Sequence, residues 1–497
     1  MFETVTPEQA GISSRVISDF IDALENCGAH THGFLFMKDG KIFAEGYYKP
    51  FDKDFCHRMY SQTKSFVGVA IGLLEEEGKL SLDDKIADYF PDKIDGELPR
   101  FLGSQTIKDM LVMTTIGESS WWFASDDPDR VHQYFNDKRR TVRPSGTLWE
   151  YDSSGSQVLC VLVERLSGKT LLEYLKEKIF DKIGFFKTAR TLKTPNGDTW
   201  GDSSLICTLR DMAAFGLFVM NYGTWNGKRL MNERYLREAT SKIVDNSDGA
   251  NYSGYAFGYG YQIWRVGGNG FAFVGMGDQL TVCYPDKNLL FTCTSDNQGA
   301  FLPREVIFTQ LRDYVLPAVK DAPTDDNPAE YNRLKNKIDG LTLKCATGQK
   351  DSPWRDKIDG KKYVCEENDM GITEFSFRFF NEKEGEFVFI NGQGEKTIPF
   401  GVNRNVFGRF PQYGYSREVG REKTDDGFTY KDAVSLAWLQ DNKILLSVQI
   451  IDDYFGNMSA TFAFKDDCVS ATFSSAAENF LTEYKGWLFA KKTNRRE

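Results

Sequence analysis

The hydrophobic pattern of this chain changes near residue 320, and that change limits what the chain can fold into. Before it, apolar residues recur at helical spacing in long segments and at strand spacing in a few short ones. After it, alternating runs such as EFSFRFF, EFVFI, KILLSVQII and SATFAFK are separated by Gly, Asn and Asp. The length of 497 residues also exceeds what one core usually serves. The pattern therefore predicts a mixed domain followed by an all-β domain.

The domain boundary is predicted in APTDDNPAEYN, a polar segment with two prolines after a predicted helix at 305–319. We expect a first domain over residues 1–320, a linker over 321–335 and a β-rich accessory domain over 336–497, which would be a small barrel or sandwich. In the first domain, the pattern predicts a helix at 14–26, a hairpin at 33–48 and a helical subdomain over about 80–250. The strand-like runs GYGYQIW, QLTVCYP and NLLFTCTS return over 255–296. The fold class is α+β.

Composition and charge argue against several kinds of partner. There are 61 basic and 71 acidic residues, and no basic run is present, so nucleic acid is not expected to bind. The longest apolar stretch, 66–74, is too short to cross a bilayer, and the N-terminus does not resemble a secretory signal. We therefore expect a cytoplasmic protein with reduced cysteines and no membrane contact. The four histidines predict no metal site, since their only close spacing is His30-x-His32.

The most apolar predicted helix, residues 61–77, begins with Ser61-Gln62-Thr63-Lys64. Residues three apart share one helical face, so the Ser61 hydroxyl and the Lys64 amine can touch. A lysine that its surroundings keep neutral can take the proton of a serine and make it a nucleophile. At a helix start, Ser61 would also lie near the positive end of the helix dipole, which stabilises an oxyanion. The structural alternative is a capping serine beside a solvated lysine.

The sequence around these residues resembles that of a known superfamily. The stretches RMYSQTKSFVGVAIGLL, TIKDMLVMTTIG and PSGTLWEYDSSGSQVLCVLVERLSG resemble the serine β-lactamase-like and penicillin-binding superfamily, in order over about residues 5–320. More narrowly, they are similar to its cytoplasmic branch of esterases, D-amino-acid peptidases and nylon-oligomer hydrolases. The resemblance implies an antiparallel sheet covered by its terminal helices beside a helical domain, with the active site in the cleft between them. It also implies a hydrolase that needs no cofactor.

The second motif of this superfamily is Tyr-x-Asn or Tyr-x-Ser, which Tyr151-Asp152-Ser153 matches. The resemblance implies that Tyr151 carries a proton from Ser61 to the leaving group. It implies that Ser153 orients Lys64 or binds substrate through a hydrogen bond. The structural alternative for Tyr151 is a core aromatic residue with a satisfied hydroxyl.

The third motif departs from the superfamily pattern of a Lys or His followed by a small residue and Gly. The segment VGMGDQ at 274–279 occupies its place and carries no cation. A main-chain N–H of Met276 or Gly277 can still complete an oxyanion hole with the N–H of Ser61. The missing charge weakens the case for a β-lactamase or carboxypeptidase that binds a substrate carboxylate. The sequence Ser295-Asp296-Asn297 matches another β-lactamase motif in the wrong chain order, so we interpret it as a turn.

The sequence thus predicts a serine hydrolase that forms an acyl-enzyme on an ester or amide of a small molecule or short peptide. Trp121 and Trp122 are candidates for an apolar wall of its pocket, with buried packing as the alternative. The accessory domain would shape the mouth of the site or a homo-oligomer interface. Two alternatives stay open: a non-hydrolysing binding protein on the same fold, and a penicillin-recognising β-lactamase or DD-peptidase. The complete set of Ser61, Lys64 and Tyr151 argues against the binding protein.

Overall fold

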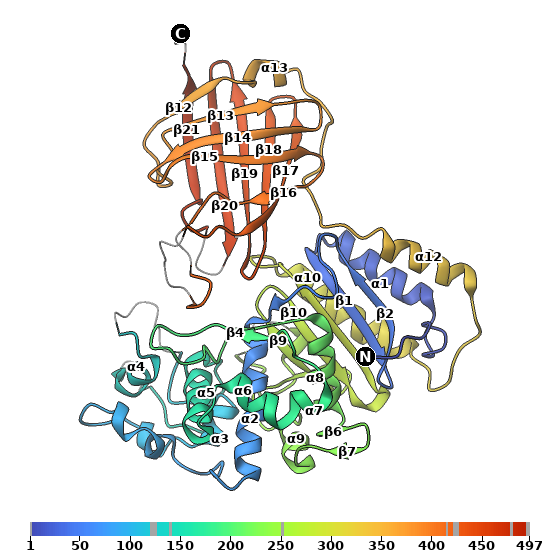
Figure 1. Ribbon diagram of the computed structural model, residues 1–497, viewed down its shortest axis with the longest axis vertical. Helices are drawn as coiled ribbons and strands as arrows, with labels where there is room; N and C mark the ends of the chain where they lie inside the picture. The colour runs from blue at the N-terminus through green and yellow to red at the C-terminus, as the bar shows by residue number, and fades with distance from the viewer. Residues whose placement is uncertain are drawn as a thin grey trace. The chain divides into compact units, whose positions relative to one another are not determined.

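The computed structural model describes residues 2–119, 127–138, 142–249, 253–413, 416–420, 427–477 and 481–493. The chain forms two compact units (Figure 1). The first comprises Met1–Thr342 together with Glu418–Gly420, and the second comprises Leu343–Arg417 and Arg421–Glu497.

The first unit extends beyond the segment in which the sequence suggests a linker. Helix α12 (Pro328–Asp339) begins inside that segment and packs against α1 (Ser14–Asn26). Lys337 of α12 forms an ion pair with Asp22 of α1 at 2.5 Å and donates to the Ser18 carbonyl at 3.2 Å. Because of these contacts, the first unit ends at Thr342 and not near residue 320.

A six-stranded antiparallel sheet forms the centre of the first unit, in the order β2-β1-β11-β10-β9-β8. Its strands are β1 (Thr31–Lys38), β2 (Lys41–Tyr47), β8 (Trp264–Val266), β9 (Gly270–Gly275), β10 (Gln279–Tyr284) and β11 (Leu289–Ser295). The predicted hairpin at 33–48 is present as β1 and β2. The predicted strand GYGYQIW is wrong except for Trp264, because φ values of +120° at Gly258 and +58° at Gln262 break the extended backbone.

Alternate residues of β1 contribute to two different hydrophobic cores. Phe34 and Phe36 share a core with the apolar residues of α1, α10 (Leu302–Thr309) and the π-helix η10 (Gln310–Val315), which α11 (Leu316–Ala318) follows. Leu35 and Met37 share the other core with α2 (Thr63–Glu76) and α8 (Leu209–Met220). The sheet is therefore covered on both faces, which explains why every residue of β1 is buried.

The region 80–250 is mainly helical and surrounds α2. Its helices are α3 (Ile107–Leu111), α4 (Arg130–Asn136), α5 (Ser153–Ser167), α6 (Leu171–Leu175), the π-helix η7 (Lys176–Phe180), α7 (Asp181–Ile183), α8 and α9 (Glu233–Ala239). Short strands accompany them: β4 (Arg190–Thr191), β5 (Leu205–Cys207), β6 (Thr224–Trp225) and β7 (Lys228–Arg229), while β3 (His57–Arg58) pairs with β5. Helix α2 packs on α5, α6 and α9 and is buried from Thr63 to Leu74, as its all-round apolar sequence predicts.

The second unit is a β-barrel closed by nine strands, in the order β15-β14-β13-β12-β21-β20-β19-β18-β17. Its strands are β12 (Lys362–Cys365), β13 (Glu374–Phe379), β14 (Glu384–Asn391), β15 (Gly394–Val402), β16 (Val406–Arg409), β17 (Lys431–Gln440), β18 (Lys443–Ile451), β19 (Phe455–Lys465), β20 (Cys468–Ala477) and β21 (Gly486–Lys492). Parallel pairing of β15 with β17, at Gly401 opposite Ser435 and Val402 opposite Leu436, closes the barrel, and β16 pairs with β17 as well. Of the two predicted architectures, the barrel is the one present.

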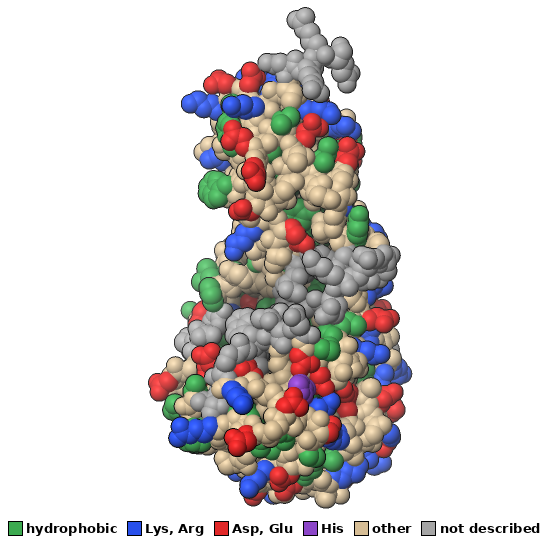
Figure 2. Space-filling model, turned by 90° about the vertical axis from the view of Figure 1, so that its left-hand side faces the viewer, with side chains coloured by type: hydrophobic (Ala, Val, Ile, Leu, Met, Phe, Trp, Pro, Cys, Tyr) green, Lys and Arg blue, Asp and Glu red, His purple; other side chains and the backbone are tan. Residues whose placement is uncertain are grey.

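The described surface carries both signs of charge. On the face shown in Figure 2, Lys and Arg side chains are interspersed with Asp and Glu side chains over both units. Within the described ranges, the chain has no helix of the length and apolarity needed to cross a bilayer.

Candidate active site

The proposed nucleophile lies in a tight turn that leads into the buried helix. Ser61 is the middle residue of the 3-10 turn η1 (Tyr60–Gln62), and α2 begins at Thr63. The preceding residue, Tyr60, has φ of +48°, in the left-handed region that non-glycine residues avoid. Such strained positions are concentrated at active sites. The turn presents Ser61 as partly exposed while its neighbours Tyr60 and Gln62 are buried.

Lys64 is held against Ser61. Its Nζ lies 3.0 Å from Ser61 Oγ and donates to the main-chain carbonyl of Asp202 at 2.8 Å. Lys64 is only 2% exposed. The predicted contact between the serine and the lysine is therefore present at hydrogen-bond distance.

Tyr151 reaches the same place from a distant part of the chain. It lies just before Asp152, the N-cap of α5, whose carboxylate accepts from Gly155 N–H at 3.0 Å. The Lys64 Nζ is 5.0 Å from the centre of the Tyr151 ring, and that ring stacks on Trp264 with centroids 5.4 Å apart. The three residues expected to carry the chemistry thus lie together.

Of the two roles that the resemblance implies for Ser153, orientation of Lys64 lacks the contact it needs, while substrate binding stays a prediction. It is the first residue of α5, and its main-chain N–H donates to Ser119 Oγ at 2.8 Å. Among the described residues, the hydrogen-bond partners of Lys64 Nζ are Ser61 and Asp202, not Ser153. The main-chain carbonyl of Asp202, rather than Ser153, therefore orients the lysine.

A pocket of about 350 Å³ opens above Ser61. Its lining includes five aromatic residues: Trp149, Tyr151, Tyr255, Trp264 and Phe301. Met276 and Gly277, the two oxyanion candidates, line the same pocket as Ser61. Trp121 and Trp122 fall in 120–126, outside the described residues, so their predicted role remains a prediction.

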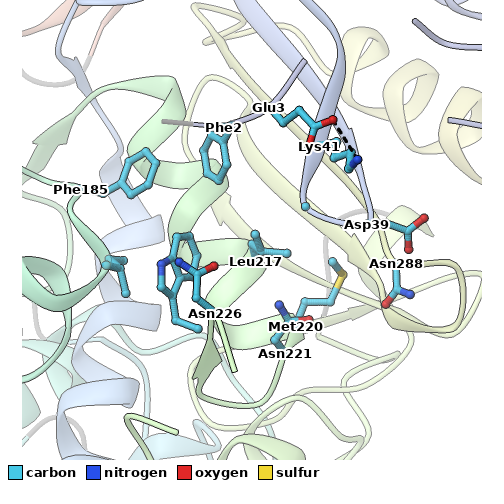
Figure 3. A pocket seen from close by; sticks show the side chains of 13 residues that line it. Phe2, Glu3, Asp39, Lys41, Phe185, Leu217, Met220, Asn221, Asn226 and Asn288 are labelled. Atoms are coloured by element: carbon cyan, nitrogen blue, oxygen red, sulfur yellow. Dashed lines mark hydrogen bonds and ion pairs between the residues drawn. The ribbon is translucent and has the colours of Figure 1, made fainter. Parts of the chain in front are cut away.

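A larger pocket of about 570 Å³ lies elsewhere in the first unit. Figure 3 shows Phe2 and Phe185 on one side of it, and Asp39 and Asn288 on the other. None of the predicted catalytic residues lines it. The smaller pocket is the better candidate for an active site, because Ser61 and Tyr151 line it.

Glycine allows the third motif to approach the nucleophile. A Cβ atom at Gly275 would lie 2.3 Å from the Met59 carbonyl oxygen, so only a glycine lets the end of β9 pack on the backbone before Ser61. The turn that follows joins β9 to β10 and needs φ of +71° at Gly277. The N–H groups of Met276 and Gly277 donate to no other residue in the described part of the chain. They are thus available to an oxyanion.

Sequence reasoning missed several residues of the pocket. Arg304 of α10 lines it and forms an ion pair with the buried Asp278, so the pocket has a guanidinium although the third motif has no cation. Asn297 also lines it and donates to Asp278 Oδ2 at 2.8 Å. The Ser295-Asp296-Asn297 segment was the one available signal, since its third residue reaches the site. No motif or residue spacing in the sequence indicates that Arg304 belongs to the pocket.

A family model for β-lactamase matches residues 18–312, which is more than half of the chain. Together with the fold and the serine–lysine pair, this match shows that the chain belongs to the β-lactamase family.

Curated relatives match over shorter stretches. A 6-aminohexanoate-dimer hydrolase of Paenarthrobacter ureafaciens is 24% identical over 221 residues, which cover 41% of this chain and 56% of that protein. Penicillin-binding protein 4* of Bacillus subtilis is 29% identical over 150 residues, which cover 28% of this chain and 32% of that protein. The chain spans about half the length of the first relative and about a third of the second.

Two solved structures show the same fold. A Bacillus anthracis protein with the provisional name 6-aminohexanoate-dimer hydrolase has a TM-score of 0.51 and 19% identity, covering 64% of this chain and 87% of that one. A penicillin-binding protein homologue from Caulobacter crescentus has a TM-score of 0.50 and 16% identity, covering 62% of this chain and 99% of that one.

Proposed function

We propose that this protein is a serine hydrolase that forms an acyl-enzyme on Ser61 from an ester or amide of a small molecule or short peptide. The observation that carries the proposal is the buried Lys64 Nζ at 3.0 Å from the Oγ of Ser61, a residue that lines a pocket able to hold a ligand. A lysine so placed can accept the serine proton when the hydroxyl attacks a carbonyl carbon.

The proposed reaction has two steps. Ser61 Oγ adds to the carbonyl while its proton passes to Lys64, and the oxyanion accepts hydrogen bonds from the N–H groups of Ser61 and of Met276 or Gly277. As the carbon–heteroatom bond breaks, Tyr151 gives its proton to the leaving group and takes the one held by Lys64, so both residues return to their starting state. Water then attacks the acyl-enzyme in the reverse sense and frees Ser61.

The pocket favours an uncharged acyl group with an apolar or aromatic part. Five aromatic side chains line it, and the Arg304 guanidinium is neutralised by Asp278. A substrate carboxylate would have to compete with that ion pair, which weighs against β-lactams as the natural substrates. The name of the Paenarthrobacter relative makes short linear amides a substrate class to test beside esters.

The test is hydrolysis of short-chain p-nitrophenyl esters by the wild type and by Ser61→Ala, with mass spectrometry for an acyl adduct. Ser65→Ala is the matched control, since Ser65 lies on the same helix and bonds to the Gln262 carbonyl at 2.7 Å, outside the pocket. We expect activity and adduct to vanish in Ser61→Ala alone. Equal activity in all three proteins, without an adduct, would contradict the proposal and favour the binding protein.

A further inference from the structure

A single guanidinium spans both ends of the turn that carries the candidate oxyanion donors. Arg304 Nε donates to the Asp278 carboxylate, and Arg304 Nη2 donates to the Gly275 carbonyl at 3.3 Å. Its remaining Nη1 donates to the Tyr255 hydroxyl at 3.1 Å. All three nitrogens therefore bond to the protein itself, and the turn from Gly275 to Asp278 is closed by an ion pair from a different element.

Asp278 is an energetically unfavourable residue at this position of the turn. Its side chain is 2% exposed, and its φ of +67° lies in the left-handed region. A buried charge is costly unless it is paired and hydrogen-bonded, and a non-glycine residue at positive φ adds strain. Arg304 and Asn297 supply the pairing, with Asn297 Nδ2 at 2.8 Å from Asp278 Oδ2. These two contacts offset part of the cost of burying the carboxylate.

The other acceptors of the turn are also fixed. Gln279 Nε2 donates to the Met276 carbonyl at 2.9 Å, and the Asn297 N–H donates to the Gly277 carbonyl at 3.1 Å. With its carbonyls held, the turn cannot rotate its peptide groups freely. The N–H groups of Met276 and Gly277, which have no acceptor among the described residues, therefore keep one direction.

We propose that Arg304 and Asp278 are positioning residues that hold the Met276 and Gly277 N–H groups toward the oxyanion formed at Ser61. The inference rests on the proposed hydrolase function. It adds that the Arg304–Asp278 ion pair, instead of a third-motif cation, supports this turn. Fixed donors are worth more than mobile ones, because no reorganisation is needed as charge develops. Neither residue needs to touch the substrate for this role.

The experiment compares Arg304→Lys, Asp278→Asn and Asp278→Gly with the wild-type protein on p-nitrophenyl butyrate. Lysine keeps the charge but cannot span three acceptors, and asparagine keeps the shape without the charge. Glycine relieves the positive φ but removes the partner of Arg304, so a purely structural role for Asp278 predicts a changed melting temperature with unchanged kcat. We expect all three variants to fold and to lose about 10- to 100-fold in kcat, with KM changed by less than about threefold.

Affinity for phenylboronic acid, which forms a tetrahedral adduct with a reactive serine, provides a second measurement. It should fall by the same factor as kcat, because both report on the tetrahedral state. The matched control is Glu45→Gln, which breaks another Arg–carboxylate pair, with Arg210 at 2.6 Å, outside the pocket. It should lower the melting temperature and leave kcat and boronate affinity unchanged.

The outcomes separate the two proposals. Unchanged kcat and boronate affinity in the Arg304 and Asp278 variants, with a wild type that hydrolyses ester through Ser61, would overturn the positioning role alone. A rise in KM with kcat unchanged would also overturn it and make Arg304 a substrate-binding residue. A wild type with neither hydrolysis nor boronate binding at Ser61 would overturn the hydrolase function and the positioning role together.

Discussion

The Nζ atom of Lys64 donates to the main-chain carbonyl of Asp202 at 2.8 Å, and this bond holds the amine beside Ser61. A carbonyl accepts hydrogen bonds but carries no full charge, so it orients the amine without forming an ion pair with it. The proposed role of Lys64 as a base depends on this uncharged partner.

Replacing Lys64 by Met should abolish most of the activity and leave the fold intact, because methionine can fill the buried site of the lysine stem. We expect kcat/KM on p-nitrophenyl esters to fall by about 10²- to 10⁴-fold, the usual contribution of a general base. Lys79→Met is the control, since Lys79 follows the same helix and pairs with Glu77 at the surface. A Lys64→Met protein with more than about a tenth of wild-type activity would contradict the role as base.

Tyr151→Phe should separate the contribution of the tyrosine hydroxyl from that of its ring. The ring stacks on Trp264, so phenylalanine keeps the packing, and the melting temperature should change little. If Tyr151 protonates the leaving group, the loss should be larger for an anilide, whose amine must be protonated, than for a p-nitrophenyl ester, whose phenolate leaves unaided. Equal losses on both substrates would exclude that role. Tyr259→Phe, in the same aromatic cluster at 5.0 Å from Trp264, is the control.

Asp432 should make the stability of the barrel depend on pH. Burial raises the pKa of its carboxyl from 3.8 to about 7. Between these values the folded state binds a proton that the unfolded state has lost, so stability falls as pH rises through this window. Asp432→Asn should therefore raise the free energy of unfolding at about pH 8 by roughly 2–4 kcal/mol, and by much less at about pH 4.

Urea unfolding of the full chain at the two pH values measures this effect. Asp467→Asn is the control, because the Asp467 side chain is 67% exposed. A stabilisation by Asp432→Asn of the same size at both pH values would show that the carboxyl does not titrate in this window.

The buried pair His32 and His57 should limit stability in acid. Their ring nitrogens Nδ1 and Nε2 lie 2.8 Å apart, and burial lowers the pKa of both, to about 3 for His57. The unfolded chain takes up protons near pH 6.5, which the folded pair does not, so stability is full above that pH and falls as pH decreases. His57→Asn should reduce the slope by about 1.4 kcal/mol per pH unit between about pH 6 and pH 4.

Urea midpoints of wild type and His57→Asn across this range provide the measurement. His132→Asn is the contrasting variant, because His132 lies between Asp127 and Asp95 and these carboxylates raise its pKa. It should steepen the acid loss rather than reduce it, since a raised pKa stabilises the folded state at low pH. Parallel curves for wild type and His57→Asn would mean that the pair is protonated in the folded state.

Local sequence determined the elements and the contact at the nucleophile. Residues three apart share one face in a 3-10 turn as well as in an α-helix, so the contact of Ser61 with Lys64 needed only helical backbone there, and the positive φ of Tyr60 did not disturb it. Alternation of apolar residues likewise predicted β18 and β19 of the barrel, since successive side chains of a strand point to opposite faces whatever the rest of the fold. The strand predicted at 258–264 was wrong, because positive φ angles break the extended backbone there although the sequence pattern still resembles a strand.

Tertiary structure decided everything that depends on segments distant in sequence. Residue types and the resemblance indicated Tyr151, but its place beside Lys64 follows from the packing of α5 on α2. The Asp202 carbonyl, the ion pair of Arg304 with Asp278 and the pair of His32 with His57 left no sequence signal. A main-chain acceptor has no residue type, and a long-range contact has no period, so only the folded chain reveals them.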